Sequence, residues 1–198
     1  MKTVRRAVIL ASALLVTVLA HAGDVKGKVS APGLKSDENI AVYIDAIAGK
    51  KFDPPAQHVT VDQRNLAFTP HTVVILRGTT VDFQNSDHVA HNVFWSSIGG
   101  NKALKQNMIV SPGHLKSFQF NNLGTAQILC NLHIQMVGYI IVVPTPYFAL
   151  TGSDGSFTIS NVPPGSYTLK DWSPEGKPAT QAVTVTDAPT NVQLTLSK

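Results

Sequence analysis

The chain has 198 residues, of which 16 are Lys or Arg and 12 are Asp or Glu. Three of the bases lie in the first 22 residues, so the rest of the chain holds 13 bases against 12 acids. A nearly neutral chain without a basic run lacks the charge pattern that tracks phosphates, which excludes nucleic acid from the expected partners. The length beyond residue 22 suits one large β domain or two small ones.

The first 22 residues have the pattern of a secretory signal peptide. Lys2, Arg5 and Arg6 form a basic start, residues 7–19 an apolar run, and Ala20–Ala22 an A-x-A cleavage site. The apolar run is too short to span a membrane and no later run is as long, so we expect no membrane span. The segment contains no cysteine, which argues against a lipid-anchored lipoprotein. We therefore expect cleavage after Ala22 and a periplasmic protein.

The rest of the chain has three zones, and the sequence pattern of each predicts strands joined by turns. Residues 23–49 contain GDVKGKVSAPGL and IAVYIDAI, and residues 58–145 contain TVVIL, TTVDFQN, NVFW, SFQF, TAQIL and GYIIVV. Residues 146–198 contain the turn signals SDG and PPG and the alternating runs TQAVTVT and NVQLTLS. Short β-branched and aromatic runs between turn residues predict an all-β fold. Residues 98–108 are the one place where we expect a short helical piece.

The segment CNLHIQM holds the single cysteine of the chain, Cys130, followed by His133 and Met136. A lone cysteine in an oxidising compartment has no intramolecular disulfide partner, so it is protected either by deep burial or by a metal. In a helix Cys130 and Met136 would be separated by about 9 Å along the axis, which is awkward for two ligands of one ion. The flanking runs are strand-like, so we expect a loop that turns all three side chains toward one point.

A thiolate, an imidazole and a thioether form part of the donor set of blue-copper sites, which also includes a second imidazole. The upstream segment NSDHVAHNVFW offers His88 and His91 for that role. We favour His91, because it lies directly before a predicted strand that can fix its direction, whereas His88 lies in the preceding loop. A thioether ligand argues against zinc, which prefers Cys, His and carboxylate.

Residues 60–143 resemble the type 1 copper cupredoxins of the plastocyanin and amicyanin group. The resemblance is carried by VILRGTTVDFQNSD, by HNVFW and by C-x2-H-x2-M followed by GYI, and the short ligand loop is most similar to that of amicyanin. It implies a Greek-key β-sandwich or barrel at residues 58–145 with one type 1 copper ion. The implied ligands are His91, Cys130, His133 and Met136.

The resemblance also implies roles for residues around the ligands. The residue after the first histidine, Asn92, would lock the ligand loop, with its backbone N–H directed at the Cys130 sulfur and its side chain tied near Asn131. His133 would lie near the surface as the electron port, with Leu132 and Ile134 as members of an apolar patch. A transient redox partner, a dehydrogenase or a cytochrome, would dock there.

The last zone, with DGSFTISNVPPGSYTL, resembles the transthyretin-like β-sandwich of carboxypeptidase regulatory-like domains. The opening pattern of that family, G-x-V-x-G-x-V, occurs at residues 23–29. We therefore expect residues 23–49 and 146–198 to form one discontinuous sandwich, into which the copper domain is inserted. The rival arrangement gives the N-terminal strands to the copper domain and leaves a separate C-terminal sandwich. Contact between residues 23–49 and the C-terminal strands distinguishes the two.

The leading functional prediction is a periplasmic electron carrier, not an enzyme, that cycles between Cu(II) and Cu(I). The first alternative is copper binding for delivery without a redox role. A copper oxidase or nitrite reductase fragment is disfavoured, because the chain lacks the additional H-x-H pairs of such enzymes. In a third possibility the sandwich binds a peptide or glycan and copper is structural. Among the other histidines after residue 22, we expect His58, His71 and His114 to be surface or loop residues. We expect His88 to lie in a loop, and the alternative for it is a role as a ligand or beside the ligands.

Overall fold

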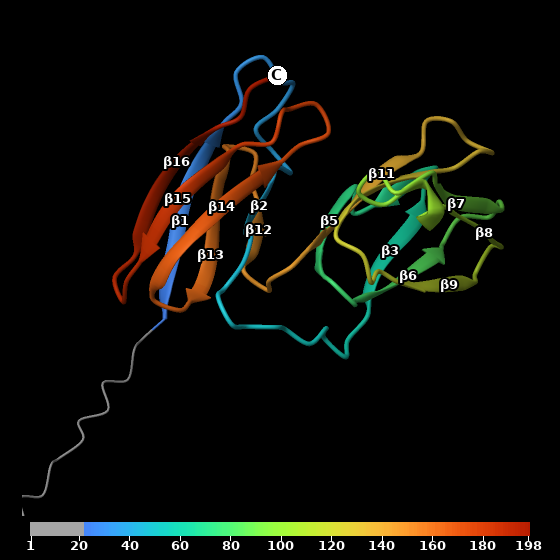
Figure 1. The fold of residues 1–198 in the computed structure, drawn as a ribbon. Helices are drawn as coiled ribbons and strands as arrows, with labels where there is room; N and C mark the ends of the chain where they lie inside the picture. The colour runs from blue at the N-terminus through green and yellow to red at the C-terminus, as the bar shows by residue number, and fades with distance from the viewer. Residues whose placement is uncertain (1–21) are drawn as a thin grey trace, which may run out of the picture.

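The structure, a computed structural model, describes residues 22–198 (Figure 1). The predicted signal peptide lies outside the described residues, apart from Ala22. The secondary structure of the described residues consists of sixteen strands and one turn of 3-10 helix, Lys102–Leu104. The all-β prediction is therefore confirmed, and the short helical piece expected within residues 98–108 is this single turn. None of the helices formed by residues 22–198 is long and apolar enough to cross a membrane.

The middle of the chain forms a sandwich of two open sheets, called the site-bearing sandwich. One sheet has the strand order β5-β11-β10-β7-β8 and the other the order β4-β3-β6-β9. The pairs β5 with β11 and β3 with β6 are parallel, and the other neighbours are antiparallel. The strands are β3 (Val59–Arg64), β4 (Ala67–Thr69), β5 (Thr72–Leu76), β6 (Thr80–Asn85), β7 (His91–Trp95), β8 (Gln106–Val110), β9 (Leu115–Gln119), β10 (Gly124–Leu129) and β11 (Val137–Val143).

The two ends of the chain form a second unit, called the terminal sandwich. One sheet has the order β13-β1-β16 and the other the order β12-β2-β14-β15. Thus β1 pairs with β13 and β16, and β2 pairs with β12 and β14. The strands are β1 (Gly23–Ser30), β2 (Ala41–Ile44), β12 (Phe148–Leu150), β13 (Ser156–Val162), β14 (Gly165–Trp172), β15 (Thr180–Val185) and β16 (Thr190–Thr195).

Each sandwich has its own apolar core. In the site-bearing sandwich Trp95, Phe83 and Phe120 are almost fully buried, and the rings of Trp95 and Phe120 lie 5.3 Å apart. Met108 is partly buried against this core. Buried and exposed residues alternate at the start of β13, as expected for a strand with one face on a core.

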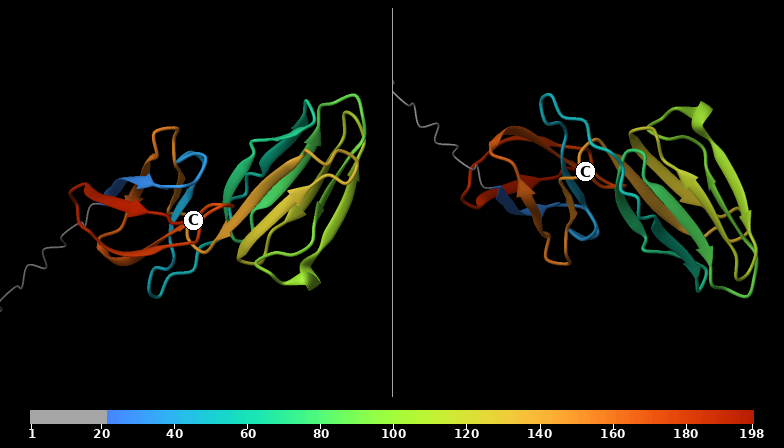
Figure 2. Two further views of the ribbon diagram at one scale, coloured as in Figure 1. Left: turned by 90° about the horizontal axis from the view of Figure 1, so that it is seen from above. Right: turned by 90° about the horizontal axis from the view of Figure 1, so that it is seen from below.

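The two sandwiches lie side by side and the chain passes between them twice, before β3 and after β11 (Figure 2). All of β5 is buried, and so are the last four residues of β11, because these strands are covered on both faces. A third apolar cluster joins these strands to the facing sheet of the terminal sandwich. Its members are Ala41, Val74, Ile141 and Val143, with Tyr43, Tyr139, Phe148, Leu150 and Trp172 packed around them.

Candidate metal centre

The segment 130–136 is a closed loop between β10 and β11, and no helix forms in it. The two strands are antiparallel and remain in register up to the pair Leu129 and Val137. The Cys130 N–H donates to the Met136 carbonyl oxygen at 3.3 Å, and the Met136 N–H donates to the His133 carbonyl oxygen at 2.9 Å. These hydrogen bonds fold the loop back on itself, which holds the Cys130 and His133 side chains on one side of it.

The strand β7 brings His91 to the same place. It lies between β8 and β10 in the sheet, and its Phe94 is aligned with Leu129 of β10. Because β7 and β10 are antiparallel, the chain that leaves β10 runs toward the start of β7, where His91 lies. The His91 side chain is fully buried. The rigidity of the sheet therefore sets the position of this imidazole.

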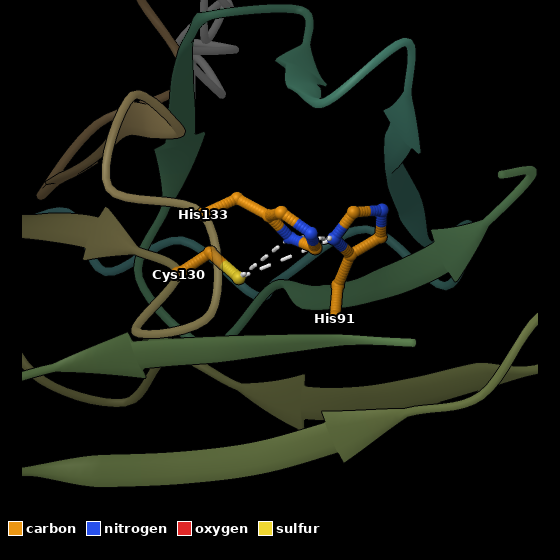
Figure 3. Close-up of side chains that lie close together, drawn as sticks. All are labelled: His91, Cys130 and His133. Atoms are coloured by element: carbon orange, nitrogen blue, oxygen red, sulfur yellow. Dashed lines mark hydrogen bonds between the residues drawn. The ribbon is translucent and has the colours of Figure 1, made fainter. Parts of the chain in front are cut away.

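Three donor side chains face one another in this structure (Figure 3). The Nδ1 atoms of His91 and His133 lie 3.0 Å apart, and the Cys130 Sγ lies 4.0 Å from the former and 3.7 Å from the latter. An ion bound at zinc-like lengths, about 2.0 Å to nitrogen and about 2.3 Å to sulfur, would separate trigonal ligands by about 3.5–3.7 Å. The observed separations scatter around these values, so the three side chains fit a single ion.

Burial distinguishes the other predicted residues of the site. Met136 is buried and belongs to the apolar core that includes Cys130. His88, the alternative imidazole, is exposed and is not a member of the His91, Cys130 and His133 group. The remaining histidines among residues 22–198, which are His58, His71 and His114, are exposed as expected.

Asn92 ties the two halves of the site together. Its side-chain Oδ1 accepts a hydrogen bond from the Asn131 N–H at 2.7 Å and one from the Cys130 thiol at 3.4 Å. Its Nδ2 donates to Asn107 Oδ1 on β8 at 2.8 Å. The predicted tie between this side chain and the ligand loop near Asn131 is confirmed. The contact with Asn107, which orients the amide, could not be predicted because β8 is remote in sequence.

Asp87 is a residue of the site that the sequence analysis missed. Its Oδ2 lies 2.9 Å from His91 Nε2, the nitrogen on the far side of the ring from the donor group. The carboxylate also accepts hydrogen bonds from the Asn65 N–H at 2.7 Å and the Leu66 N–H at 3.0 Å. Burial by itself would raise the pKa of Asp87, but the hydrogen bonds from Leu66, His91 and Asn65 outweigh it and lower the pKa below its usual value. The carboxyl group is therefore held in its ionised form.

Only the spacing D-x3-H could have pointed to Asp87 in the sequence. That spacing is informative on a helix, where residues four apart share a face. Residues 86–90 form an irregular connection between β6 and β7, so the spacing alone does not bring the two side chains together. The turn between β3 and β4 that holds the carboxylate lies more than twenty positions earlier in the chain.

The fold and the donor group of residues 55–143 are consistent with a cupredoxin domain. This stretch, somewhat less than half of the chain, matches the family model of copper binding proteins of the plastocyanin/azurin family. The resemblance that the sequence predicted is thus confirmed for this domain. Together the family match and the His91, Cys130 and His133 group support copper as the metal. Residues 145–193 match the model described as polysaccharide lyase family 4, domain II, which fits a further β-sandwich segment here.

Solved structures to which part of the chain is similar include several forms of amicyanin. A reduced amicyanin variant has 20% sequence identity, with 51% of this chain and 97% of that chain covered and a TM-score of 0.40. A second variant in the Cu(I) form at pH 4 has 22% identity, with 51% and 97% covered and a TM-score of 0.40. A purple cupredoxin from Nitrosopumilus maritimus has 22% identity, with 42% and 98% covered and a TM-score of 0.38. The comparison with curated proteins finds no relative.

Proposed function

We propose that this protein is a periplasmic blue-copper electron carrier with one type 1 copper ion held by His91, Cys130, His133 and Met136. The observation that carries the proposal is the placement of two imidazoles and one thiolate at separations that suit a trigonal site. Met136 would complete the set as a weak thioether donor, a ligand type that is usual at such sites. Its burial in the core beside Cys130 supports that role.

Electron transfer is favoured by the way the donors are held. When bound, copper supplies a one-electron couple between Cu(II) and Cu(I). The chain's contribution is to keep the donor atoms in one arrangement for both states, because a carrier must not reorganise during transfer. His91 is buried in a sheet, and the Asn92 amide joins the strand of His91 to the loop of Cys130. A site built for handing copper to another protein would instead expose its ligands.

The surface beside the loop supports a transient docking site for a redox partner. His133 is partly exposed, whereas His91 is fully buried, so His133 is the imidazole nearer the solvent. Next to it Leu132 is 59% exposed and Ile134 is 89% exposed. Large apolar side chains that remain in water next to a polar site are typical of interaction surfaces. We propose that a dehydrogenase or a cytochrome docks there and exchanges electrons through His133.

The same proposal includes the organisation and the export of the chain. Residues 1–22 act as the signal peptide, and residues 58–145 form the copper domain. This domain is inserted into a sandwich made of residues 23–49 and 146–198. The pairing of β1 with β13 and β16, and of β2 with β12 and β14, supports the insertion.

Copper loading followed by metal analysis, visible spectroscopy and voltammetry tests this function. We expect one copper per chain, an intense thiolate-to-copper band and a reversible one-electron wave. Cys130→Ser should abolish the band, because the thiolate is its origin, whereas His88→Ala should leave it unchanged. A band that survives the first substitution or is lost with the second would show that the ligand set is wrong. Stoichiometric copper without a reversible wave would favour copper delivery instead.

A further inference from the structure

A carboxylate lies behind the buried imidazole of the proposed copper site. Asp87 Oδ2 is 2.9 Å from His91 Nε2, and the side chains are 15% and 0% exposed, respectively. An ionised carboxylate has no proton to donate, so the hydrogen bond requires the proton to be on Nε2. His91 Nδ1, which faces Cys130 and His133, is then the nitrogen with a free lone pair.

The carboxylate itself is fixed by a turn from another part of the sheet. The Asn65 and Leu66 N–H groups, between β3 and β4, donate to Oδ1 and Oδ2 of Asp87 at 2.7 and 3.0 Å. Both residues have positive φ, 54° and 57°, which directs their two N–H groups to the same acceptor. The Asp87 N–H in turn donates to Asn85 Oδ1 at 3.0 Å. The carboxylate therefore has little freedom to turn away from the imidazole.

From this arrangement we infer that Asp87 is a positioning residue of the metal centre that fixes the orientation and tautomer of His91 and lowers the reduction potential of the copper. The inference rests on the proposed function, because it takes His91 Nδ1 to be a ligand. A hydrogen-bonded carboxylate makes an imidazole a more basic ligand. A more basic ligand favours the more highly charged Cu(II) over Cu(I), which corresponds to a lower potential.

A second carboxylate–histidine pair in the same sandwich provides the matched control. Asp82 Oδ1 lies 3.0 Å from His58 Nδ1, so the pair has nearly the same length. The His58 side chain is 48% exposed, however, and it does not belong to the donor group. Replacing either aspartate by asparagine removes the same charge, and only one of the two replacements alters a group that contacts the proposed site.

The test compares Asp87→Asn with Asp82→Asn and the wild type, all copper-loaded. We expect Asp87→Asn to weaken Cu(II) binding about tenfold more than Cu(I) binding, because outer contacts of this kind contribute about 10–100-fold to metal affinity. A tenfold change in that ratio raises the potential of a one-electron couple by about 59 mV. Asp82→Asn should leave the potential at the wild-type value. Asparagine keeps an oxygen that can accept from the turn at residues 65–66, so the substitution is compatible with folding.

A measurement on the wild type does not depend on the variant's folding. In the diamagnetic Cu(I) protein, nitrogen-15 NMR should show a proton on His91 Nε2 that is strongly downfield and exchanges slowly with water. Fast exchange of that proton, or coordination through Nε2, would overturn the inference. So would an Asp87→Asn potential that matches that of Asp82→Asn. If the wild type shows no thiolate-to-copper band at all, the proposed function has failed instead, so the two failures are distinguishable.

Discussion

The substitution Asn92→Ala tests, in the metal-free protein, how strongly this side chain connects the two halves of the site. Asn92 is 4% exposed, and its side chain hydrogen-bonds to two chain segments, the ligand loop and β8. Its oxygen accepts from the Asn131 N–H at 2.7 Å, and its nitrogen donates to Asn107 Oδ1 at 2.8 Å. Alanine removes both of these hydrogen bonds, together with the longer one from the Cys130 thiol at 3.4 Å, and offers their partners no replacement.

The magnitude follows from these two contacts. A hydrogen bond between neutral groups contributes about 1 kcal/mol net, and a buried partner left unpaired costs about 1–3 kcal/mol. The Asn131 N–H is partly buried, whereas Asn107 is exposed and can turn to water. We therefore expect Asn92→Ala to lower the free energy of unfolding of the metal-free protein by about 2–3 kcal/mol. Asn107→Ala, which removes only one of the bonds, should cost about 1 kcal/mol.

Urea unfolding followed by tryptophan fluorescence measures this loss, since Trp95 lies in the core of the site-bearing sandwich. Asn121→Ala is the control, because Asn121 is exposed and its Nδ2 makes one long contact, 3.3 Å, with Gln119 Oε1. Exposed substitutions of this kind change the free energy of unfolding by less than about 0.5 kcal/mol. If Asn92→Ala is as mild as Asn121→Ala, the amide does not hold the loop and the reasoning is refuted.

Two further predictions concern the terminal sandwich. A Cβ at Gly27 would lie 2.5 Å from the Val192 carbonyl oxygen of the neighbouring strand, so Gly27→Ala should lower the melting temperature of this sandwich. At temperatures well below that melting temperature, the visible spectrum of the copper-loaded protein should be unchanged. Gly152→Ala, where the nearest atom would be 3.5 Å away, should be tolerated in the same calorimetric scan, and equal effects of the two would contradict the argument. Burial raises the pKa of Asp171, partly offset by a hydrogen bond from Ala179, so the folded state holds this proton more tightly than the unfolded state does. The contribution of Asp171 to stability is therefore greatest below its unfolded pKa and falls as the pH rises toward its folded pKa. In Asp171→Asn this part of the pH dependence of the unfolding free energy should be missing, and a profile parallel to that of the wild type would show that Asp171 does not titrate in this way.

The strands could be predicted from the sequence because each corresponds to a short run of β-branched and aromatic residues between turn residues. TVVIL became β5, TTVDFQN contains β6, and GYIIVV lies within β11. The grouping of His91, Cys130 and His133 in the candidate site could be predicted for a related reason. Cys130 and His133 lie in one short loop, and β7 begins at His91, so the donor types and the flanking strands are visible along the chain.

Other features had no local signal. The runs at residues 23–49 favoured one discontinuous sandwich but left the rival arrangement open, and only the hydrogen-bonded registers of β1 and β2 place them beside the C-terminal strands. The cluster between the sandwiches is a further example. The run TVVIL predicts the strand β5, but it does not show that β5 is buried throughout or which surface covers its second face.

The sequence by itself determined the all-β class, the segments that become strands and the donor residues of the candidate site. These properties depend on residue types at short, fixed spacings along the chain. Such spacings are the same in the unfolded and the folded chain, so they can be recognised without the structure. Only the tertiary structure decided that Asp87 lies behind His91, that Asn107 orients Asn92, and that the turn at residues 65–66 holds the carboxylate. Such contacts join positions brought together by strand pairing, and pairing is set by the whole core rather than by any one segment.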